Sequence, residues 1–190
     1  MNVRIKPGRL KGEVIIPPSK SLAHRAIIAA SLAKGKSKIT NIAYSDDIKA
    51  TIDGMKALGA KIECYSDYLI IEGSSVKRVK NIIDANESGS TLRFLIPISL
   101  VSDEEITFVG HNRLVKRPLD VYYDLFDKKE ISYFHPEDSY LPLRIKGSLR
   151  PGLFEVPGNV SSQFITGLLY TLPMLDGNSK IVITTKLESK

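Results

Sequence analysis

One local pattern occurs three times along the chain and constrains its fold more than any single motif. Each copy has serines beside a turn, then an apolar-periodic helix, then a strand rich in β-branched residues. Serine is a favoured N-cap, because its hydroxyl accepts a hydrogen bond from a free N–H of the first helical turn. The copies lie about 70 residues apart, which indicates a repeated structural unit. Their serine pairs are Ser19 and Ser21, Ser88 and Ser90, and Ser161 and Ser162.

The first two copies continue with a second amphipathic helix and a β-hairpin. The hairpins join residues 61–65 to 68–72 and residues 131–134 to 140–145, with strand-forming residues bounded by turn formers. A strand is also expected at residues 14–16, where a proline pair ends it. The repeated unit reads α-β-α-β-β, so the sequence predicts an α/β fold; if the strand that precedes each first helix is counted as its first, the unit becomes β-α-β-α-β-β. The third unit stops near Lys190, before its second helix, so we expect it to be truncated.

Composition is that of an ordinary globular protein. The chain has 190 residues, of which 43% are hydrophobic and 25% charged, enough for one core. It has no run of 18 apolar residues and no signal-peptide core at residues 1–7, so we expect no membrane partner. The single cysteine, Cys64, excludes an internal disulfide and suits a reducing cytoplasm. We expect it to be a packed thiol in a hairpin strand.

A net charge of +6 favours anionic partners, either small phosphates or nucleic acid. The basic residues are dispersed, aromatic residues are only 7%, and no zinc-finger, homeodomain or RNP motif occurs, so we expect no nucleic-acid partner. Residues 35–37 imitate the end of a nucleotide-binding P-loop, but Ala30 stands where its first glycine is required. The three histidines, His24, His111 and His135, lack metal-ligand spacing, so no metal site is expected.

The start of the first helix is the strongest candidate site. Lys20 stands at the helix start, and Ser21 and Arg25 are four residues apart, so they share one face. Free N–H groups and the helix dipole favour a phosphate or carboxylate at such a position. The alternative is a capped surface helix with two solvated cations, and the recurrence of the pattern argues for the anion site.

Residues at the other helix starts extend this candidate site. Gly89 has no side chain, so the backbone there allows a ligand to approach closely, and Arg93 follows one turn later. Arg117 comes just before an expected helix start, where a cation opposes the dipole and is either solvated or bound to an anion. The third helix start offers groups that suit a polyhydroxylated or phosphorylated small molecule, namely Ser161, Ser162 and Gln163.

Taken in order, these motifs resemble the 5-enolpyruvylshikimate-3-phosphate synthase family. The matching stretches cover essentially the whole chain and are residues 18–21, 24–26, 40–42, 45–47, 58–60, 88–93, 116–118 and 160–164. The UDP-N-acetylglucosamine enolpyruvyl transferases share the architecture, but typically carry Lys-Asn where this chain has Lys20 and Ser21. They also have a reactive loop cysteine, which Cys64 does not match in position, so the shikimate family is favoured.

The resemblance implies transfer of the enolpyruvyl group from phosphoenolpyruvate to the 5-hydroxyl of shikimate 3-phosphate, with release of phosphate. This is a step of chorismate and aromatic amino-acid synthesis that needs no organic cofactor and is the target of glyphosate. The family fold is an inside-out, barrel-like α/β domain present twice. Residues 1–16 would be a strand segment of the missing second domain, and residues 17–190 an incomplete N-terminal domain that is inactive alone. The alternative is a standalone module that binds small anions.

The resemblance also assigns roles to individual residues. Contacts to shikimate 3-phosphate are implied for Lys20, Ser21, Arg25, Ser161, Ser162, Gln163 and Ser189. Contacts to phosphoenolpyruvate are implied for Lys20, Gly89, Arg117 and Gln163. Lys20 is also a candidate proton donor, which makes it the expected catalytic residue. Two positions depart from the family: Glu87 replaces a frequent asparagine, and Phe94 replaces a proline of some relatives.

Overall fold

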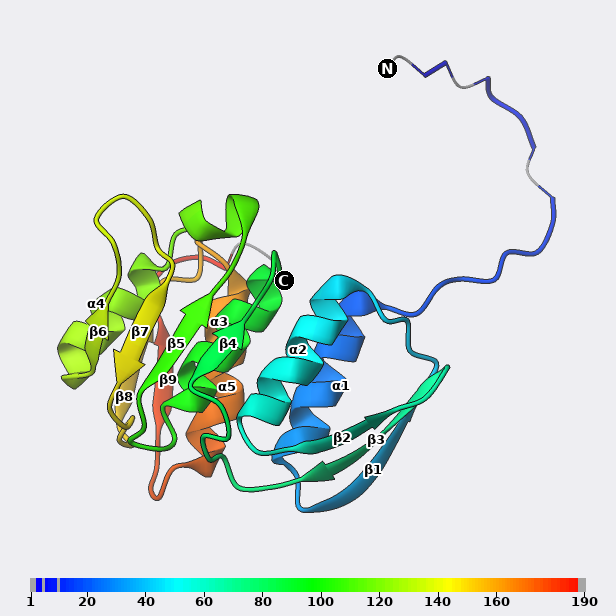
Figure 1. Ribbon diagram of the computed structural model, residues 1–190. Coiled ribbons are helices and arrows are strands. Elements are labelled where there is room, and N and C mark those ends of the chain that lie inside the picture. Colours follow the sequence, from blue (N-terminus) through cyan, green and yellow to red (C-terminus); the bar gives the residue numbers. More distant parts are fainter. Residues whose placement is uncertain (1–2, 5, 10, 188–190) are drawn as a thin grey trace.

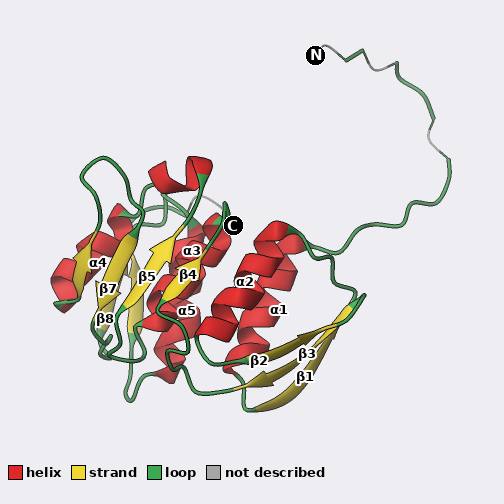
Figure 2. Ribbon diagram, in the orientation of Figure 1, coloured by secondary structure: helices red, strands yellow, loops and turns green. Residues whose placement is uncertain are grey.

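The computed structural model describes residues 3–4, 6–9 and 11–187. It is a mixed α/β protein in which α1, α2, α3 and α5 run side by side and three sheets flank them (Figures 1 and 2). The helices are α1 (Lys20–Leu32), α2 (Asp46–Ala57), α3 (Gly89–Ser99), α4 (Asp120–Lys129) and α5 (Ser162–Thr171), with 3-10 turns η1 (Asn112–Lys116) and η2 (Leu172–Met174). Within these residues no helix has the length and apolar character needed to cross a membrane.

The strands form three separate sheets. They are β1 (Gly35–Thr40), β2 (Lys61–Cys64), β3 (Tyr68–Gly73), β4 (Ile82–Asp84), β5 (Ile106–Val109), β6 (Ser132–Phe134), β7 (Leu143–Lys146), β8 (Leu153–Val156) and β9 (Lys180–Ile183). The first sheet has the antiparallel order β1-β3-β2, and the second has the order β4-β5-β7-β6. In the second sheet β4 is parallel to β5, and the other pairs are antiparallel. The third sheet is the parallel pair β8-β9.

The three serine-led helices begin where the sequence predicts them. The hydroxyl of Ser19 accepts a hydrogen bond from the Leu22 N–H, which caps α1. Ser88 caps α3 in the same way through the N–H of Thr91, and Ser161 caps α5 through the N–H of Gln163. The predicted helix starts at these serines are therefore confirmed.

Several local expectations were wrong. Residues 14–16 form no strand with any described residue, and their side chains are 81–97% exposed on an extended segment that leaves the body of the protein (Figure 1). Three apolar residues do not make a strand unless a partner strand lies beside them. Cys64 is exposed rather than packed. The last strand of the second hairpin begins at Leu143, because Pro142 has no N–H for the ladder.

Strands β4 and β8 were not located by the sequence analysis. Each lies just before a serine-led helix and pairs in parallel with the strand that follows that helix, β5 or β9. The element order is therefore α-β-α-β-β for residues 20–73 and β-α-β-α-β-β for residues 82–146. Within the described chain, α1 has no such leading strand.

Helices α3 and α5 pack closely, and Gly167 makes this approach possible. A Cβ built on Gly167 would lie 2.6 Å from the Arg93 carbonyl oxygen, 2.6 Å from the Tyr122 hydroxyl and 2.9 Å from Cγ of Pro97. The buried Tyr122 of α4 donates its hydroxyl to the carbonyl oxygens of Arg93 and Phe164, and so joins α3 to α5. This contact sets where the α5 start lies relative to the α3 start.

We expect Gly167→Ala to lower the free energy of unfolding by about 1–3 kcal/mol. The new methyl group would meet the Arg93 carbonyl oxygen and the buried Tyr122 hydroxyl, neither of which can move away freely. Urea unfolding followed by circular dichroism measures this change. Gly8→Ala is the matched control, since a Cβ there has nothing within 4 Å, and its effect should stay within about 0.5 kcal/mol. Equal stability of the two variants would contradict the close packing.

Candidate functional site

The starts of α1, α2, α3 and α5 lie together at one end of the helix layer (Figure 1). Side chains join them in pairs: Lys20 of α1 contacts Asp47 of α2, and Gln163 of α5 contacts Ser90 of α3. The Thr91 hydroxyl of α3 lies 3.3 Å from the Asp47 carbonyl oxygen. Each helix start carries free N–H groups and the positive end of a dipole. Four such ends in one place form a strongly positive region.

The junction of α1 and α2 holds the first cation. Lys20 Nζ lies 2.5 Å from Oδ2 of Asp47, which stands in the first turn of α2. A carboxylate at that position interacts favourably with the α2 dipole as well as with the lysine. The Lys20 side chain remains 58% exposed, so a ligand can reach it. Asp47 therefore supplies the negative charge that balances Lys20 when no anion is bound.

The Arg25 side chain contacts its own helix and α3. Its Nη1 donates to the Ser21 carbonyl oxygen at 3.0 Å, and its guanidinium lies 5.4 Å from the centre of the Phe94 ring. Phe94 of α3 in turn meets Tyr170 of α5 edge to face. A cation over an aromatic face is attracted by the ring quadrupole. Phe94, which departs from the family pattern, thus lies directly against Arg25.

The junction of α3 and α5 is a hydrogen-bonded pair of side chains. Arg93 Nη1 donates to Oε1 of Gln163 at 2.9 Å, and Arg93 Nη2 donates to the Pro118 carbonyl oxygen at 3.3 Å. Nε2 of Gln163 donates to the Ser90 hydroxyl at 2.9 Å. The Gln163 amide is therefore fixed at both ends, and it lies between the starts of the two helices.

Arg117 lies directly over the start of α3. A Cβ built on Gly89 would be only 2.7 Å from Nη1 of Arg117 and 3.8 Å from Nη1 of Arg93. Two guanidinium groups thus approach the same helix start, where their positive charges repel each other and the dipole. The absence of a side chain at Gly89 lets the Arg117 guanidinium approach this closely, and an anion at this point would reduce the repulsion.

A buried polar chain runs beneath these helix starts. His24 Nδ1 lies 2.7 Å from the Thr51 hydroxyl, which lies 2.7 Å from the Thr91 hydroxyl, and Thr91 donates to the Ser88 hydroxyl at 2.8 Å. The pKa of His24 is lowered from 6.5 to about 4, chiefly by burial; Asp47 raises it, and Lys20 and Arg25 lower it. The imidazole is therefore neutral near pH 7.

The structure brings most of the candidate residues together, although it does not test their roles. Lys20, Ser21 and Arg25 share the α1 start, and Gly89 and Arg117 meet at the α3 start. The third group stands at the α5 start, as the cap and first two helical residues Ser161, Ser162 and Gln163. Ser189 lies outside the described residues. The Glu87 carboxylate accepts a hydrogen bond from the Asn112 side chain at 2.9 Å, so it is engaged outside these contacts.

Sequence reasoning missed three contributors. Ser90 was treated only as part of a cap, yet it holds Gln163 across the two helices. Thr51 and Thr91 were not considered, although both are fully buried. The sequence signal for both is a threonine near the start of a helix and on its apolar face. A hydroxyl buried there needs a hydrogen-bond partner.

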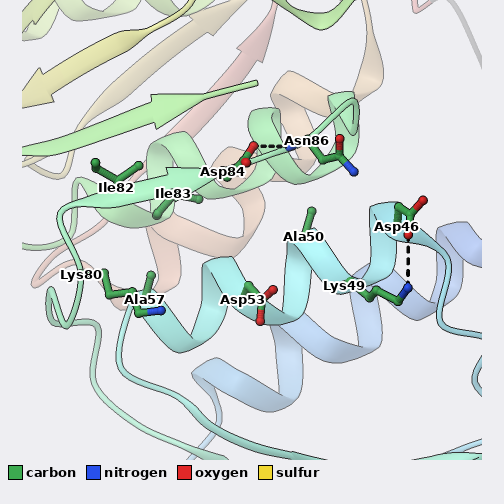
Figure 3. A pocket seen from close by; sticks show the side chains of 10 residues that line it. All are labelled: Asp46, Lys49, Ala50, Asp53, Ala57, Lys80, Ile82, Ile83, Asp84 and Asn86. Carbon is green, nitrogen blue, oxygen red and sulfur yellow. Dashed lines mark hydrogen bonds and ion pairs between the residues drawn. The ribbon is translucent and has the colours of Figure 1, made fainter. Parts of the chain in front are cut away.

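A separate groove of about 410 Å³ lies between α2 and β4 and contains no residue of the site just described (Figure 3). Two of its three carboxylates are engaged: Asp46 pairs with Lys49 at 3.2 Å, and Asp84 accepts from the Asn86 N–H and contacts His111. Nowhere in the described ranges do three acidic, histidine or cysteine side chains gather as metal ligands would.

Comparison with known proteins gives consistent matches. The family model described as EPSP synthase (3-phosphoshikimate 1-carboxyvinyltransferase) matches residues 5–190. A 3-phosphoshikimate 1-carboxyvinyltransferase of Clostridium perfringens is 57% identical over 190 residues, which are 99% of this chain and 45% of that protein. The enzyme of that name from Clostridioides difficile is 53% identical over 200 residues, covering 100% of this chain and 46% of that protein. The chain thus spans about half the length of these relatives.

A solved structure shares the fold. EPSP synthase from Acinetobacter baumannii superposes with a TM-score of 0.79 at 22% sequence identity, over 91% of this chain and 40% of that one. The likeness at this identity concerns the fold, and it agrees with the mixed α/β class expected from the sequence.

The buried His24 should make stability depend on pH. Its pKa is lower in the folded chain, about 4, than the ordinary value of 6.5, so between these values the unfolded chain binds more protons. The free energy of unfolding should therefore fall as the pH falls from about 6.5 to 4, by up to about 3 kcal/mol in total. Urea unfolding across this range measures the slope.

The control for this prediction is His24→Asn, which removes the titrating group and keeps His111 and His135. Its unfolding free energy should vary less with pH over the same window, because the other histidines and the carboxylates contribute equally to both proteins. Identical pH slopes for the two proteins would contradict a buried neutral imidazole at this position.

Proposed function

This chain belongs to the EPSP synthase family, and on that premise we propose that its helix-start site takes part in enolpyruvyl transfer from phosphoenolpyruvate to the 5-hydroxyl of shikimate 3-phosphate. The observation that carries the proposal is the convergence of four helix N-termini around Lys20, Arg25, Arg93 and Arg117. Both substrates are multiply charged anions. A region where positive charges repel one another is therefore suited to hold both anions together.

We assign shikimate 3-phosphate to the α1 and α5 starts. Lys20 and Arg25 would neutralise its phosphate, and the hydroxyl of Ser21 stands on the same exposed turn. The residues proposed to contact the remaining polar groups of this substrate are Ser161, Ser162, Gln163 and Ser189. Serine hydroxyls and a glutamine amide both donate and accept, as recognition of a polyhydroxylated ring requires.

We assign phosphoenolpyruvate to the start of α3. The first turn of α3 carries the positive end of the helix dipole, Arg117 lies beside Gly89, and Gln163 bonds Ser90 in the same turn. Lys20 would lie between the two substrates and contact both. This arrangement supports catalysis by positioning, because it offsets the repulsion between two anions and holds them in one orientation.

Lys20 has a further proposed role as the proton donor. Its ammonium group pairs with Asp47, and its side chain is 58% exposed. On substrate binding, a phosphate or carboxylate oxygen would share or replace the Asp47 contact. The lysine would then donate a proton to the bridging oxygen of the leaving phosphate, and the proton lost by the attacking 5-hydroxyl would restore the ammonium group.

The relatives named above are about twice as long as this chain. We propose that the segment corresponding to the rest of their length completes the site, so the 190 residues hold a half-site that binds but does not turn over. We also place the protein in the cytoplasm. The free, exposed Cys64 supports a reducing compartment.

The test is titration calorimetry of the 190-residue chain with shikimate 3-phosphate, repeated on Arg25→Ala. We expect weak binding by the unaltered chain and a loss of about tenfold or more in the variant, because a charged hydrogen-bond donor is removed. Arg144→Ala is the matched control, since Arg144 also lies over a phenylalanine ring but stands on β7. No binding to folded protein, or equal losses in both variants, would contradict the assignment.

Gly89→Ala tests the phosphoenolpyruvate side. The new methyl group would meet the flexible end of Arg117, so the fold should keep its stability while phosphoenolpyruvate binding weakens about fivefold or more. Calorimetry in the presence of shikimate 3-phosphate measures the affinity. In an Arg117→Ala background, Gly89→Ala should reduce the affinity for phosphoenolpyruvate much less, since the guanidinium group that the methyl would displace is no longer present. An equal cost in both backgrounds would show that Arg117 does not mediate the effect.

A further inference from the structure

The buried chain of His24, Thr51, Thr91 and Ser88 is not explained by ligand contact. The four residues are 0–2% exposed, and they lie on α1, α2, α3 and the α3 cap. None of them can touch a substrate in this arrangement. Four hydrogen-bonding side chains in a core are nonetheless costly unless each has a partner, and apolar residues of similar size would avoid that cost.

The bonds of this chain link groups that are distant in sequence. His24 and Thr51 are 27 residues apart, and Thr51 and Thr91 are 40 residues apart. Both threonine hydroxyls also lie 3.3 Å from the carbonyl oxygen of Asp47, which ties the first turn of α2 into the same chain. The Ser88 hydroxyl oxygen accepts hydrogen bonds from both the hydroxyl and the backbone N–H of Thr91. Directional bonds of this kind fix positions more narrowly than apolar contacts do.

Each member is a near neighbour of a proposed substrate-binding group. His24 comes directly before Arg25 and one turn after Lys20, and Ser88 comes directly before Gly89. Thr51 follows one turn after Asp47, the partner of Lys20. A shift of any one helix along its axis would break a bond of the buried chain and move a cation of the site by the same amount.

We propose that His24, Thr51 and Thr91 are positioning residues that hold the starts of α1, α2 and α3 in register, so that the shikimate 3-phosphate and phosphoenolpyruvate half-sites face each other correctly. This inference rests on the proposed function, because it concerns the same site. The imidazole acts as a neutral hydrogen-bonding group. Its Nε2 has no hydrogen-bond partner among the described residues, so the Nδ1 bond to Thr51 is its link to the chain.

The charged groups that face His24 agree with a neutral imidazole. Lys20 and Arg25 on its own helix disfavour a positive charge, and Asp47 across on α2 favours it but is already paired with Lys20. A protonated imidazole would add a third cation beneath the anion site. The neutral form leaves the charge balance of that site to the exposed residues.

The experiment measures binding of shikimate 3-phosphate to the 190-residue chain by calorimetry, with His24→Leu, His24→Asn, Thr91→Val and Thr171→Val. We expect His24→Leu and Thr91→Val to weaken binding about three- to tenfold, since buried hydrogen-bond partners are lost and the helix starts shift. His24→Asn should restore affinity to within about twofold of the unaltered chain, because its amide can occupy the Nδ1 position.

Thr171→Val is the matched control for the threonine variant. Thr171 is as fully buried as Thr91, but its hydroxyl donates to the Gly167 carbonyl oxygen of its own helix. Loss of the Thr171 hydroxyl should lower the free energy of unfolding without changing the affinity for shikimate 3-phosphate. Urea unfolding of all variants identifies the conditions in which each is folded, so that binding is compared among folded proteins only.

Unfolding also tests the buried chain without a ligand. His24 and Thr91 do not bond each other directly, yet both bond Thr51. In a double-mutant cycle, His24→Leu and Thr91→Val should therefore couple by about threefold or more in the unfolding equilibrium constant. His24→Leu and Thr171→Val should combine without such coupling.

The possible outcomes separate this inference from the proposed function. Weaker binding in both network variants, with rescue by asparagine and a silent control, supports positioning. If His24→Leu and Thr91→Val bind as tightly as Thr171→Val does, the positioning role is overturned and the proposed function stands. If the unaltered chain binds no shikimate 3-phosphate, the proposed function fails, and the unfolding cycle alone decides: coupling supports the register of the helix starts, and additivity overturns it.

Discussion

The rest of this structure depends on the gathering of four helix N-termini in one place. Such an arrangement is electrostatically unfavourable, because like ends of helix dipoles and several cations lie close together. Three features offset the cost: serine caps on α1, α3 and α5, the Asp47 carboxylate in the first turn of α2, and the buried chain of hydroxyls and imidazole beneath. Hydrogen bonds and a carboxylate within the fold thus offset the electrostatic cost of the gathered helix N-termini.

The parallel strand pairs account for the directions of α3 and α5. A parallel pair such as β4-β5 or β8-β9 requires a crossover, and α3 and α5 are those crossovers. Their shared direction brings Ser88 and Ser161 to the same end of the protein. Gly167 then lets the two helices approach closely enough for Arg93 and Gln163 to bond. The backbone topology therefore brings the helix starts together, and side-chain bonds then join them.

The property that makes the helix starts costly is also the property that a binding site for anions needs. Lys20 is balanced by Asp47, and Arg93 is engaged with Gln163, while Arg117 lies beside Gly89. These groups are already oriented before a ligand arrives. Preorganised charges of this kind stabilise bound anions without a large rearrangement.

Local signals in the sequence determined much of this protein. Capping serines and apolar periodicity located α1, α3 and α5, and alternation with turn residues located the β2-β3 hairpin, because these features depend on neighbours within about one turn or one strand. The candidate cations were also visible, since Lys20, Arg25 and Arg117 stand at or near helix starts.

Only the tertiary structure decided the rest. The short strands β4 and β8 exist because β5 and β9 lie beside them, whereas residues 14–16, which have a stronger apolar signal, find no such partner in the described chain. The Lys20–Asp47 pair, the contact of Arg117 with Gly89 and the link of Ser90 to Gln163 join residues 27 to 73 positions apart. Packing fixes such pairings, and no local pattern encodes them.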